Sequence, residues 1–90
     1  MTIETEITVI NKLGLHARAA AKLVKLSANY DSDIKLFKLE QSVDAKSIMG
    51  VLMLAATQGT ELRLRVCGED EVQASADICE LFANYFDEGE

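Results

Sequence analysis

Proline and tryptophan are absent from this sequence of 90 residues, and it holds only two cysteines and one histidine. No apolar run approaches the ~18 residues that suggest a membrane span. The first ten residues hold none of the basic residues that open a secretory signal. Cys67 and Cys79 lack the Cys-x-x-Cys spacing of a zinc site. We therefore expect a cytoplasmic protein without membrane insertion or a metal site, in which both cysteines are free, buried thiols.

Basic residues are also few, 9 against 15 acidic residues, which gives a net charge of −6. Nucleic acids and anionic membranes repel so acidic a chain, so neither is expected as a partner. The length suits a single domain over residues 1–90 with one thin core. Little room remains for a deep catalytic cavity. The sequence thus favours a monomer that works through other proteins, without a cofactor, over a stand-alone enzyme.

Hydrophobic periodicity predicts seven elements of secondary structure. The expected strands are 2–10, 34–39, 42–45 and 60–67, and the expected helices are 17–29, 47–56 and 71–86. Asp70 is a candidate N-cap for the last helix, which would bury Val72 on its apolar face. The connection around Leu39 lacks the glycine or asparagine that a tight hairpin prefers. Residues 87–90 are expected to form a frayed tail.

Each predicted strand alternates apolar and polar residues, so each has one polar face. A sheet with one polar face is antiparallel and carries its helices on the other face. The predicted fold is therefore α+β: an open-faced sandwich of order β-α-β-β-α-β-α, with a four-stranded antiparallel sheet and three helices on one face.

The only histidine stands where a predicted loop enters the first predicted helix. His16 follows Gly14, which lets backbone amides approach a ligand closely. The helix that starts at Ala17 offers unpaired N–H groups and the positive end of its dipole. Arg18 adds a guanidinium suited to phosphate oxygens. This arrangement favours phosphoryl transfer onto His16, with Gly14, Ala17 and Arg18 binding the phosphoryl group. The alternative interpretation is a capping or merely exposed histidine.

Ser47 precedes the second predicted helix and is expected to be its N-cap. A phosphate on this serine would also be stabilised by the helix N-terminus, so a regulatory phosphorylation site stays open beside the capping role. Ile48 and Leu52 fall on the predicted core face of this helix. Met49 and Met53 lie beside that face. For Met49, Leu52 and Met53, core packing and an adaptable docking surface are both open.

Two segments resemble one known family. The segment GLHARAAAKLV (14–24) is similar to the active-site segment of the HPr family, the histidine phosphocarriers of the bacterial phosphotransferase system. The segment AKSIMGVLMLAA (45–56) is similar to the family's second signature, around its regulatory serine. Both segments have the family's spacing, and the order of elements agrees over nearly the whole chain.

The resemblance implies that Nδ1 of His16 receives a phosphoryl group from enzyme I, which phosphoenolpyruvate charges, and passes it to an enzyme IIA domain. It implies that Arg18 helps to hold this group. Ser47 matches the serine that HPr kinase/phosphorylase modifies in bacteria that have this enzyme. The residues that match the family's partner-docking surface are Ile48, Met49, Leu52 and Met53.

One position departs from the family pattern: Ala19 stands where a proline is most common. Alanine is a good helix former, so the helix is expected to persist, and only the fine geometry of the site is affected. Two other functions stay open. One is a carrier in a regulatory, nitrogen-related branch of the phosphotransferase system, and the other is a protein-interaction regulator that transfers nothing. An acyl-carrier role would need an Asp-Ser-Leu attachment motif, which the sequence lacks.

Overall fold

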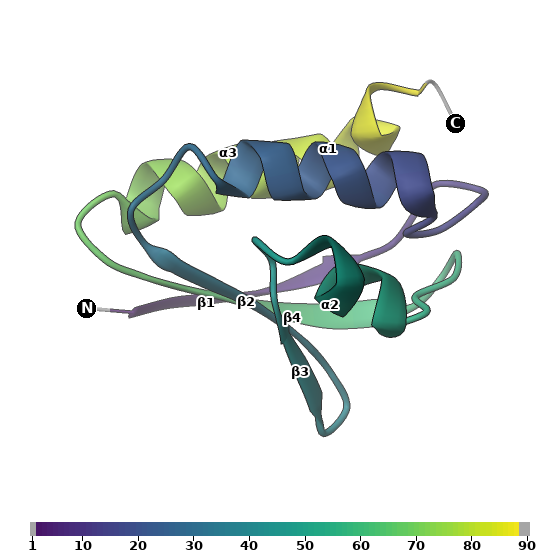
Figure 1. Ribbon diagram of the computed structural model, residues 1–90, viewed down its shortest axis with the longest axis horizontal. Helices are drawn as coiled ribbons and strands as arrows, with labels where there is room; N and C mark the ends of the chain where they lie inside the picture. Colours follow the sequence, from purple (N-terminus) through teal and green to yellow (C-terminus); the bar gives the residue numbers. More distant parts are fainter. Residues whose placement is uncertain (1, 89–90) are drawn as a thin grey trace.

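In the computed structural model, which describes residues 2–88, four antiparallel strands form one open sheet of order β1-β4-β2-β3 (Figure 1). The strands are β1 (Thr2–Thr8), β2 (Asp33–Lys38), β3 (Gln41–Asp44) and β4 (Glu61–Cys67). The helices are α1 (Ala17–Ser27), α2 (Ile48–Met53) and α3 (Glu71–Ala83), with a short 3-10 turn, η1 (Tyr85–Asp87), at the end. The predicted order of strands and helices and the open-faced sandwich are confirmed. Within residues 2–88, no helix is both long enough and apolar enough to cross a membrane.

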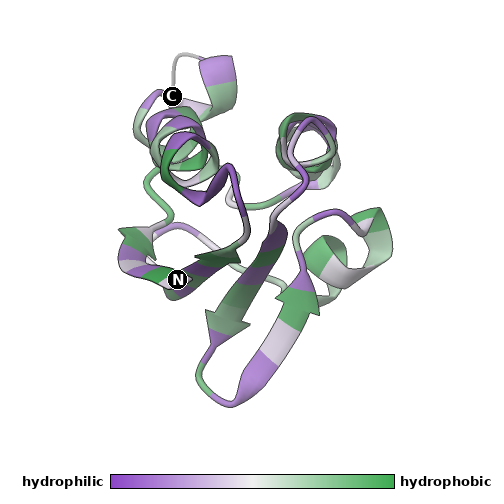
Figure 2. Ribbon diagram, turned by 90° about the vertical axis from the view of Figure 1, so that its left-hand side faces the viewer, coloured by the Kyte–Doolittle hydropathy of each residue, from purple (hydrophilic) through white to green (hydrophobic). Residues whose placement is uncertain are grey.

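Alternation along the strands turns one row of side chains into the core. Leu64 of β4 pairs with Thr5 of β1 and Leu36 of β2, and both leucines are fully buried. Figure 2 shows the same alternation as stripes of hydropathy along the strands. Both α1 and α3 lie side by side over this face (Figures 1 and 2), and their Leu23 and Ile78 join the same buried cluster. Each such side chain contributes about 1.5–3 kcal/mol, so the two inner strands, β4 and β2, and these two helices hold the fold together.

Two side chains expected in the core lie on the surface instead. Cys67 is exposed, because it shares the outward face of β4 with Arg63 and Arg65, while Leu64 and Val66 alternate with them and point inward. Val72 is 72% exposed, because α3 turns Ala74 and its helical neighbours toward the core. Cys79 is partly buried, and desolvation raises the pKa of its thiol. The prediction of buried thiols is therefore wrong for Cys67.

The chain turns sharply after α3, which ends at Ala83 and not at residue 86. The three residues of η1 all have positive φ, between 54° and 62°. This is left-handed backbone, which residues other than glycine seldom adopt. The reversal tucks Phe86 into the core, fully buried, with its ring centre 4.8 Å from that of Phe82.

The structure differs from the prediction at the C-terminal tail and at the end of the second helix. The frayed tail is wrong for Asp87 and Glu88, since the N–H of Glu88 donates to the carbonyl of Tyr85 at 3.0 Å. Residues 89–90 lie outside the described residues. The second helix ends at Met53, short of residue 56, because Ala55 has a φ of 51° and interrupts the helical path.

The hairpin between β2 and β3 is tighter than its sequence suggests. Lys38 pairs with Gln41, so only Leu39 and Glu40 form the turn. Leu39 has a φ of 55° and is 91% exposed. A left-handed leucine costs roughly 1–2 kcal/mol, so strand pairing imposes this turn against the local preference.

Asp70 fastens the start of α3 to the connection between α1 and β2. It occupies the N-cap position, but its side chain makes no capping hydrogen bond to the helix. Its carboxylate instead accepts hydrogen bonds from the N–H of Asp31 at 2.8 Å, the N–H of Ser32 at 3.0 Å and the Ser32 hydroxyl. The hydroxyl of Ser32, followed by the backbone donors, lowers the pKa of Asp70 below its usual 3.8.

We predict that Asp70→Asn removes part of the acid sensitivity of the fold. Because the folded pKa is lowered, the carboxylate stabilises the native state fully above about pH 4 and loses that contribution as the pH falls through the folded value. Urea unfolding of the wild type and Asp70→Asn, measured from pH 7 down to the lowest pH at which both still fold, should show that the difference in their stability shrinks below about pH 4. Asp31→Asn, which keeps the backbone donor, is the control. A stability difference that does not change with pH would contradict the prediction.

Candidate functional site

Hydrogen bonds hold the loop before α1 at its start and at its tip. At its start, the N–H of Val9 donates to the carbonyl of Thr60 at 2.9 Å, and the N–H of Gly59 donates to the carbonyl of Val9 at 2.7 Å. At its tip, the side-chain amide of Asn11 donates to the carbonyl of Gly14 at 2.7 Å, and the Gly14 N–H returns to the Asn11 carbonyl at 3.1 Å. Asn11 is buried, and sequence reasoning missed its role in shaping this loop.

Gly14 lets this loop press against the segment that follows α2. A Cβ at position 14 would lie 2.4 Å from the carbonyl oxygen of Ala56, and the φ of Gly14 is +68°. The next N–H, that of Leu15, donates to the same carbonyl at 2.9 Å. Glycine is therefore required at position 14 for the close approach of two backbones. The N–H of Gly14 itself is bonded within the loop, to the Asn11 carbonyl.

His16 occupies the N-cap position of α1. Its backbone is extended, with φ −74° and ψ 177°, and its carbonyl accepts the N–H of Ala20 at 2.8 Å. The imidazole makes no capping bond. The N–H groups of the first turn of α1, including those of Ala17 and Arg18, therefore have no partner within the helix. The first turn holds no acidic residue. Ala19 is fully buried in this turn, and α1 begins at Ala17 as predicted.

Glu88 contacts both residues on which the site prediction depends. Its Oε1 lies 3.0 Å from Nε2 of His16, and its Oε2 lies 3.8 Å from Nε of Arg18. The Glu88 side chain is 13% exposed, against 26% for His16 and 75% for Arg18. Sequence reasoning missed Glu88, because a separation of 72 positions leaves no local signal.

An open hollow of about 550 Å³ lies over this junction, and its lining residues are Lys12, Leu13, His16, Ala17, Arg18 and Glu88. Three predicted site residues, His16, Ala17 and Arg18, meet there, while Gly14 and Ser47 are not among the lining residues. Lys12 and Arg18 supply positive charge and the helix supplies unpaired N–H groups, so the hollow suits a small anion held beside an imidazole.

Ser47 is the N-cap of α2, as predicted, and its Oγ accepts the N–H of Gly50 at 3.1 Å. Met49 and Met53 are 65% and 68% exposed, so they do not pack in the core. Ile48, expected on the core face, is 39% exposed. Leu52 is partly buried against the core. The short α2 thus leaves an apolar surface in solvent beside its capping serine.

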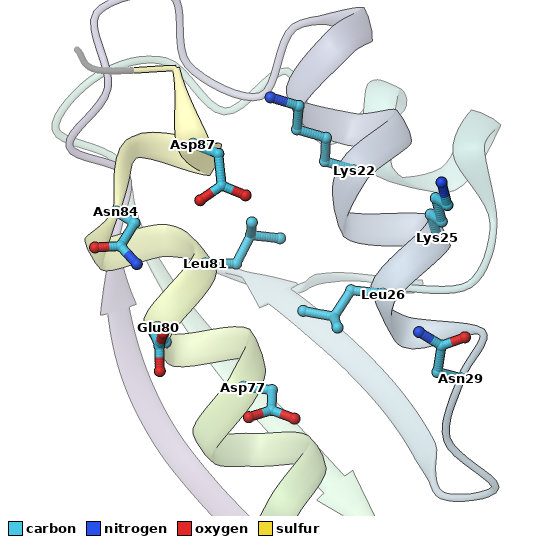
Figure 3. Close-up of a pocket in the computed structure, with 9 residues that line it drawn as sticks. All are labelled: Lys22, Lys25, Leu26, Asn29, Asp77, Glu80, Leu81, Asn84 and Asp87. Atoms are coloured by element: carbon cyan, nitrogen blue, oxygen red, sulfur yellow. The ribbon is translucent and has the colours of Figure 1, made fainter.

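A second hollow, a groove of about 450 Å³, runs between α1 and α3 (Figure 3). Its lining residues are Lys22, Lys25, Leu26, Asn29, Asp77, Glu80, Leu81, Asn84 and Asp87. At one end, Nζ of Lys22 donates to the carbonyl of Phe86 at 2.7 Å. This bond ties η1 to α1, and it therefore helps to fix Glu88 beside His16.

Fold and site together define a small open-faced sandwich with a histidine at the N-terminus of its first helix. Residues 3–84 match the family described as "PTS HPr component phosphorylation site". The phosphocarrier protein HPr of Xylella fastidiosa strain Temecula1 is 54% identical over 86 residues, which cover 96% of this chain and 97% of that protein.

Solved structures agree with this likeness. HPr-C-His from Thermoanaerobacter tengcongensis has a TM-score of 0.92 and 38% identity, over 96% of this chain and 97% of the other. A structure described as an HPr dimer from the same organism has a TM-score of 0.76 and 39% identity, over 89% and 92% of the two chains. The chain belongs to the HPr family, the phosphocarriers of the phosphotransferase system.

We predict that Gly14→Ala destabilises the protein by more than about 2 kcal/mol, because the new Cβ combines a backbone clash with left-handed strain. Gly59→Ala is the matched control, since Gly59 also has positive φ, +91°, but a Cβ there meets nothing within 4 Å. The control should lose only about 1 kcal/mol. Urea unfolding measures both variants, and equal losses would show that the contact with Ala56 is unimportant.

Proposed function

We propose that Nδ1 of His16 accepts a phosphoryl group from phosphoenolpyruvate-charged enzyme I and passes it to an enzyme IIA domain. The observation that carries this proposal is the position of the imidazole at the N-terminus of α1, inside a hollow that also presents Arg18. Nε2 is engaged by Glu88, which leaves Nδ1 as the ring nitrogen for the reaction. Helix N–H groups and a guanidinium are the donors that an incoming phosphoryl group requires.

Arg18 and the first turn of α1 hold the transferred group in this proposal. The Arg18 side chain is 75% exposed, and 3.8 Å separates its Nε from Oε2 of Glu88, longer than a hydrogen bond, so the guanidinium is free to turn toward a phosphoryl group on His16. Ala17 contributes its N–H. Ala19 keeps an N–H that the family's usual proline lacks, but it is fully buried and does not line the hollow. Gly14 acts indirectly, by setting the path of the loop.

The exposure of the site suits a carrier. Phosphoryl transfer depends on positioning and on stabilising charge, and a partner that docks over an open hollow can supply part of both. A shallow site also binds the group weakly enough to release it. The protein is in this view a covalent intermediate between two cytoplasmic partners, working as a monomer, and not an enzyme with its own substrate pocket.

We assign partner docking to the apolar surface of α2. The exposed side chains of Met49 and Met53, with Ile48 beside them, offer a flexible apolar contact that adapts to more than one partner. Leu52 supports this surface from below, where it packs against the core. Enzyme I and enzyme IIA would then contact this surface in turn.

We also assign Ser47 as a regulatory site for HPr kinase/phosphorylase. Its Oγ already lies at the N-terminus of α2, where phosphate oxygens would meet the same N–H groups. A phosphate there would add negative charge beside the apolar docking surface and oppose partner binding.

The carrier function predicts that the protein gains one acid-labile phosphoryl group when it is incubated with phosphoenolpyruvate and enzyme I. His16→Ala should gain none, because no other imidazole is present. Arg18→Ala should label more slowly, because it loses a phosphate donor. Mass spectrometry before and after acid treatment measures the label. A wild-type protein that stays unlabelled with several enzyme I preparations would favour the interaction regulator.

The regulatory role of Ser47 predicts that Ser47→Asp weakens the binding of enzyme I, measured by titration calorimetry. Ser42→Asp, which adds the same charge at an exposed position of β3, should bind normally. Ser47→Ala should bind normally too, while losing about 1 kcal/mol of stability with its cap. Equal binding by the two aspartate variants would argue against a charge switch at α2.

A further inference from the structure

The contact between Glu88 and His16 determines which nitrogen of the imidazole is available. An ionised carboxylate can only accept hydrogen bonds. With Oε1 3.0 Å from Nε2, the hydrogen of a neutral His16 must lie on Nε2. The lone pair of the ring is then on Nδ1, the nitrogen that reacts in the proposed function. In many enzymes a carboxylate fixes the tautomer and orientation of a histidine in the same way.

The fold holds Glu88 in this position through several contacts. Glu88 directly follows η1, whose left-handed residues cannot persist without support from their surroundings. Phe86 anchors the turn in the core, and Lys22 donates to its carbonyl. The Glu88 N–H closes the turn on the Tyr85 carbonyl at 3.0 Å. The carboxylate therefore reaches His16 from a built turn and not from a loose tail.

The second carboxylate oxygen is held in an unusual environment. Oε2 of Glu88 is buried and has no hydrogen-bond partner within residues 2–88. Arg18 lies near it at 3.8 Å, close enough for charge attraction only. Leaving such an oxygen unpaired has a cost in free energy. The carboxylate group is thus directed at the imidazole, where positive charge develops during the reaction.

We propose that Glu88 is a positioning residue for phosphoryl transfer, which selects the Nε2–H tautomer of His16 and stabilises its positive charge; this role rests on the proposed function. The Nδ1 lone pair forms the new N–P bond, while the bond from phosphorus to the donor breaks and its electron pair stays on the donor. The Nε2 proton does not leave. The ring thus becomes positively charged, and the carboxylate on Nε2–H offsets that charge.

Two variants separate the tautomer from the charge. Glu88→Ala removes both effects, whereas Glu88→Gln keeps a carbonyl acceptor of the same shape and removes the charge. Asp87→Asn is the matched control, since it removes one negative charge from the same turn but is not among the residues that line the site. Urea unfolding of all three variants checks that their folds persist.

The first measurement is the ¹⁵N spectrum of the His16 imidazole in the unphosphorylated protein, well above the pH at which histidine ordinarily ionises. The wild type and Asp87→Asn should show Nε2–H alone, and Glu88→Ala should show a mixture of both tautomers. An unchanged tautomer in Glu88→Ala would overturn the selection role. This readout does not depend on enzyme I.

The second measurement is single-turnover phosphorylation by saturating, phosphorylated enzyme I. Glu88→Ala should react at least about 10-fold more slowly, an effect of the size seen when the carboxylate partner of a metal-binding histidine is removed. Glu88→Gln should also be slower than wild type, and Asp87→Asn should match it. A wild-type rate in Glu88→Gln would overturn the charge role alone, and a wild-type rate in Glu88→Ala would overturn the positioning role in transfer as a whole. No labelling of the wild type would overturn the proposed function and this role with it.

Discussion

The close approach of two backbones at Gly14 is the constraint on which the site depends. The carbonyl of Ala56 receives the N–H of Leu15 and leaves no space for a Cβ at position 14. That single oxygen fixes the loop one residue before His16, and with it the start of α1. It also belongs to the segment that leaves α2. The histidine and the serine-capped helix are therefore joined by backbone contacts, whose geometry depends little on the side chains around them.

Local periodicity is strong enough in this chain to reveal the elements. The strands β2, β3 and β4 lie within one residue of their predicted bounds, because alternation along a half-buried strand is set by the sequence itself. The errors come where tertiary structure overrides a local pattern. Cys67 continued an apolar run but follows the outward face of its strand, and Leu39 was placed in a left-handed turn by the pairing of its neighbours.

The predictions for the site succeed and fail for the same reason. His16, Arg18 and Ser47 could be predicted because each lies at a helix start, where neighbouring residues in the sequence indicate its chemical role. Glu88 could not be found. Its position depends on a reversal after α3, on the burial of Phe86 and on a lysine of α1, and none of these is visible in the residues around it. A residue that completes a site from the far end of a chain becomes apparent only once the chain is folded.

The turn that carries Glu88 shows how the core supports a strained position. Three left-handed residues cost about 1–2 kcal/mol each. Burial of Phe86 contributes about 1.5–3 kcal/mol, its ring contact with Phe82 about 0.5–1.5 kcal/mol, and the charged donor Lys22 about 1.5–3 kcal/mol. These favourable contributions are of the same size as the strain. The turn therefore persists because the core and α1 hold it, and a carboxylate positioned in this way is coupled to the packing of the whole domain.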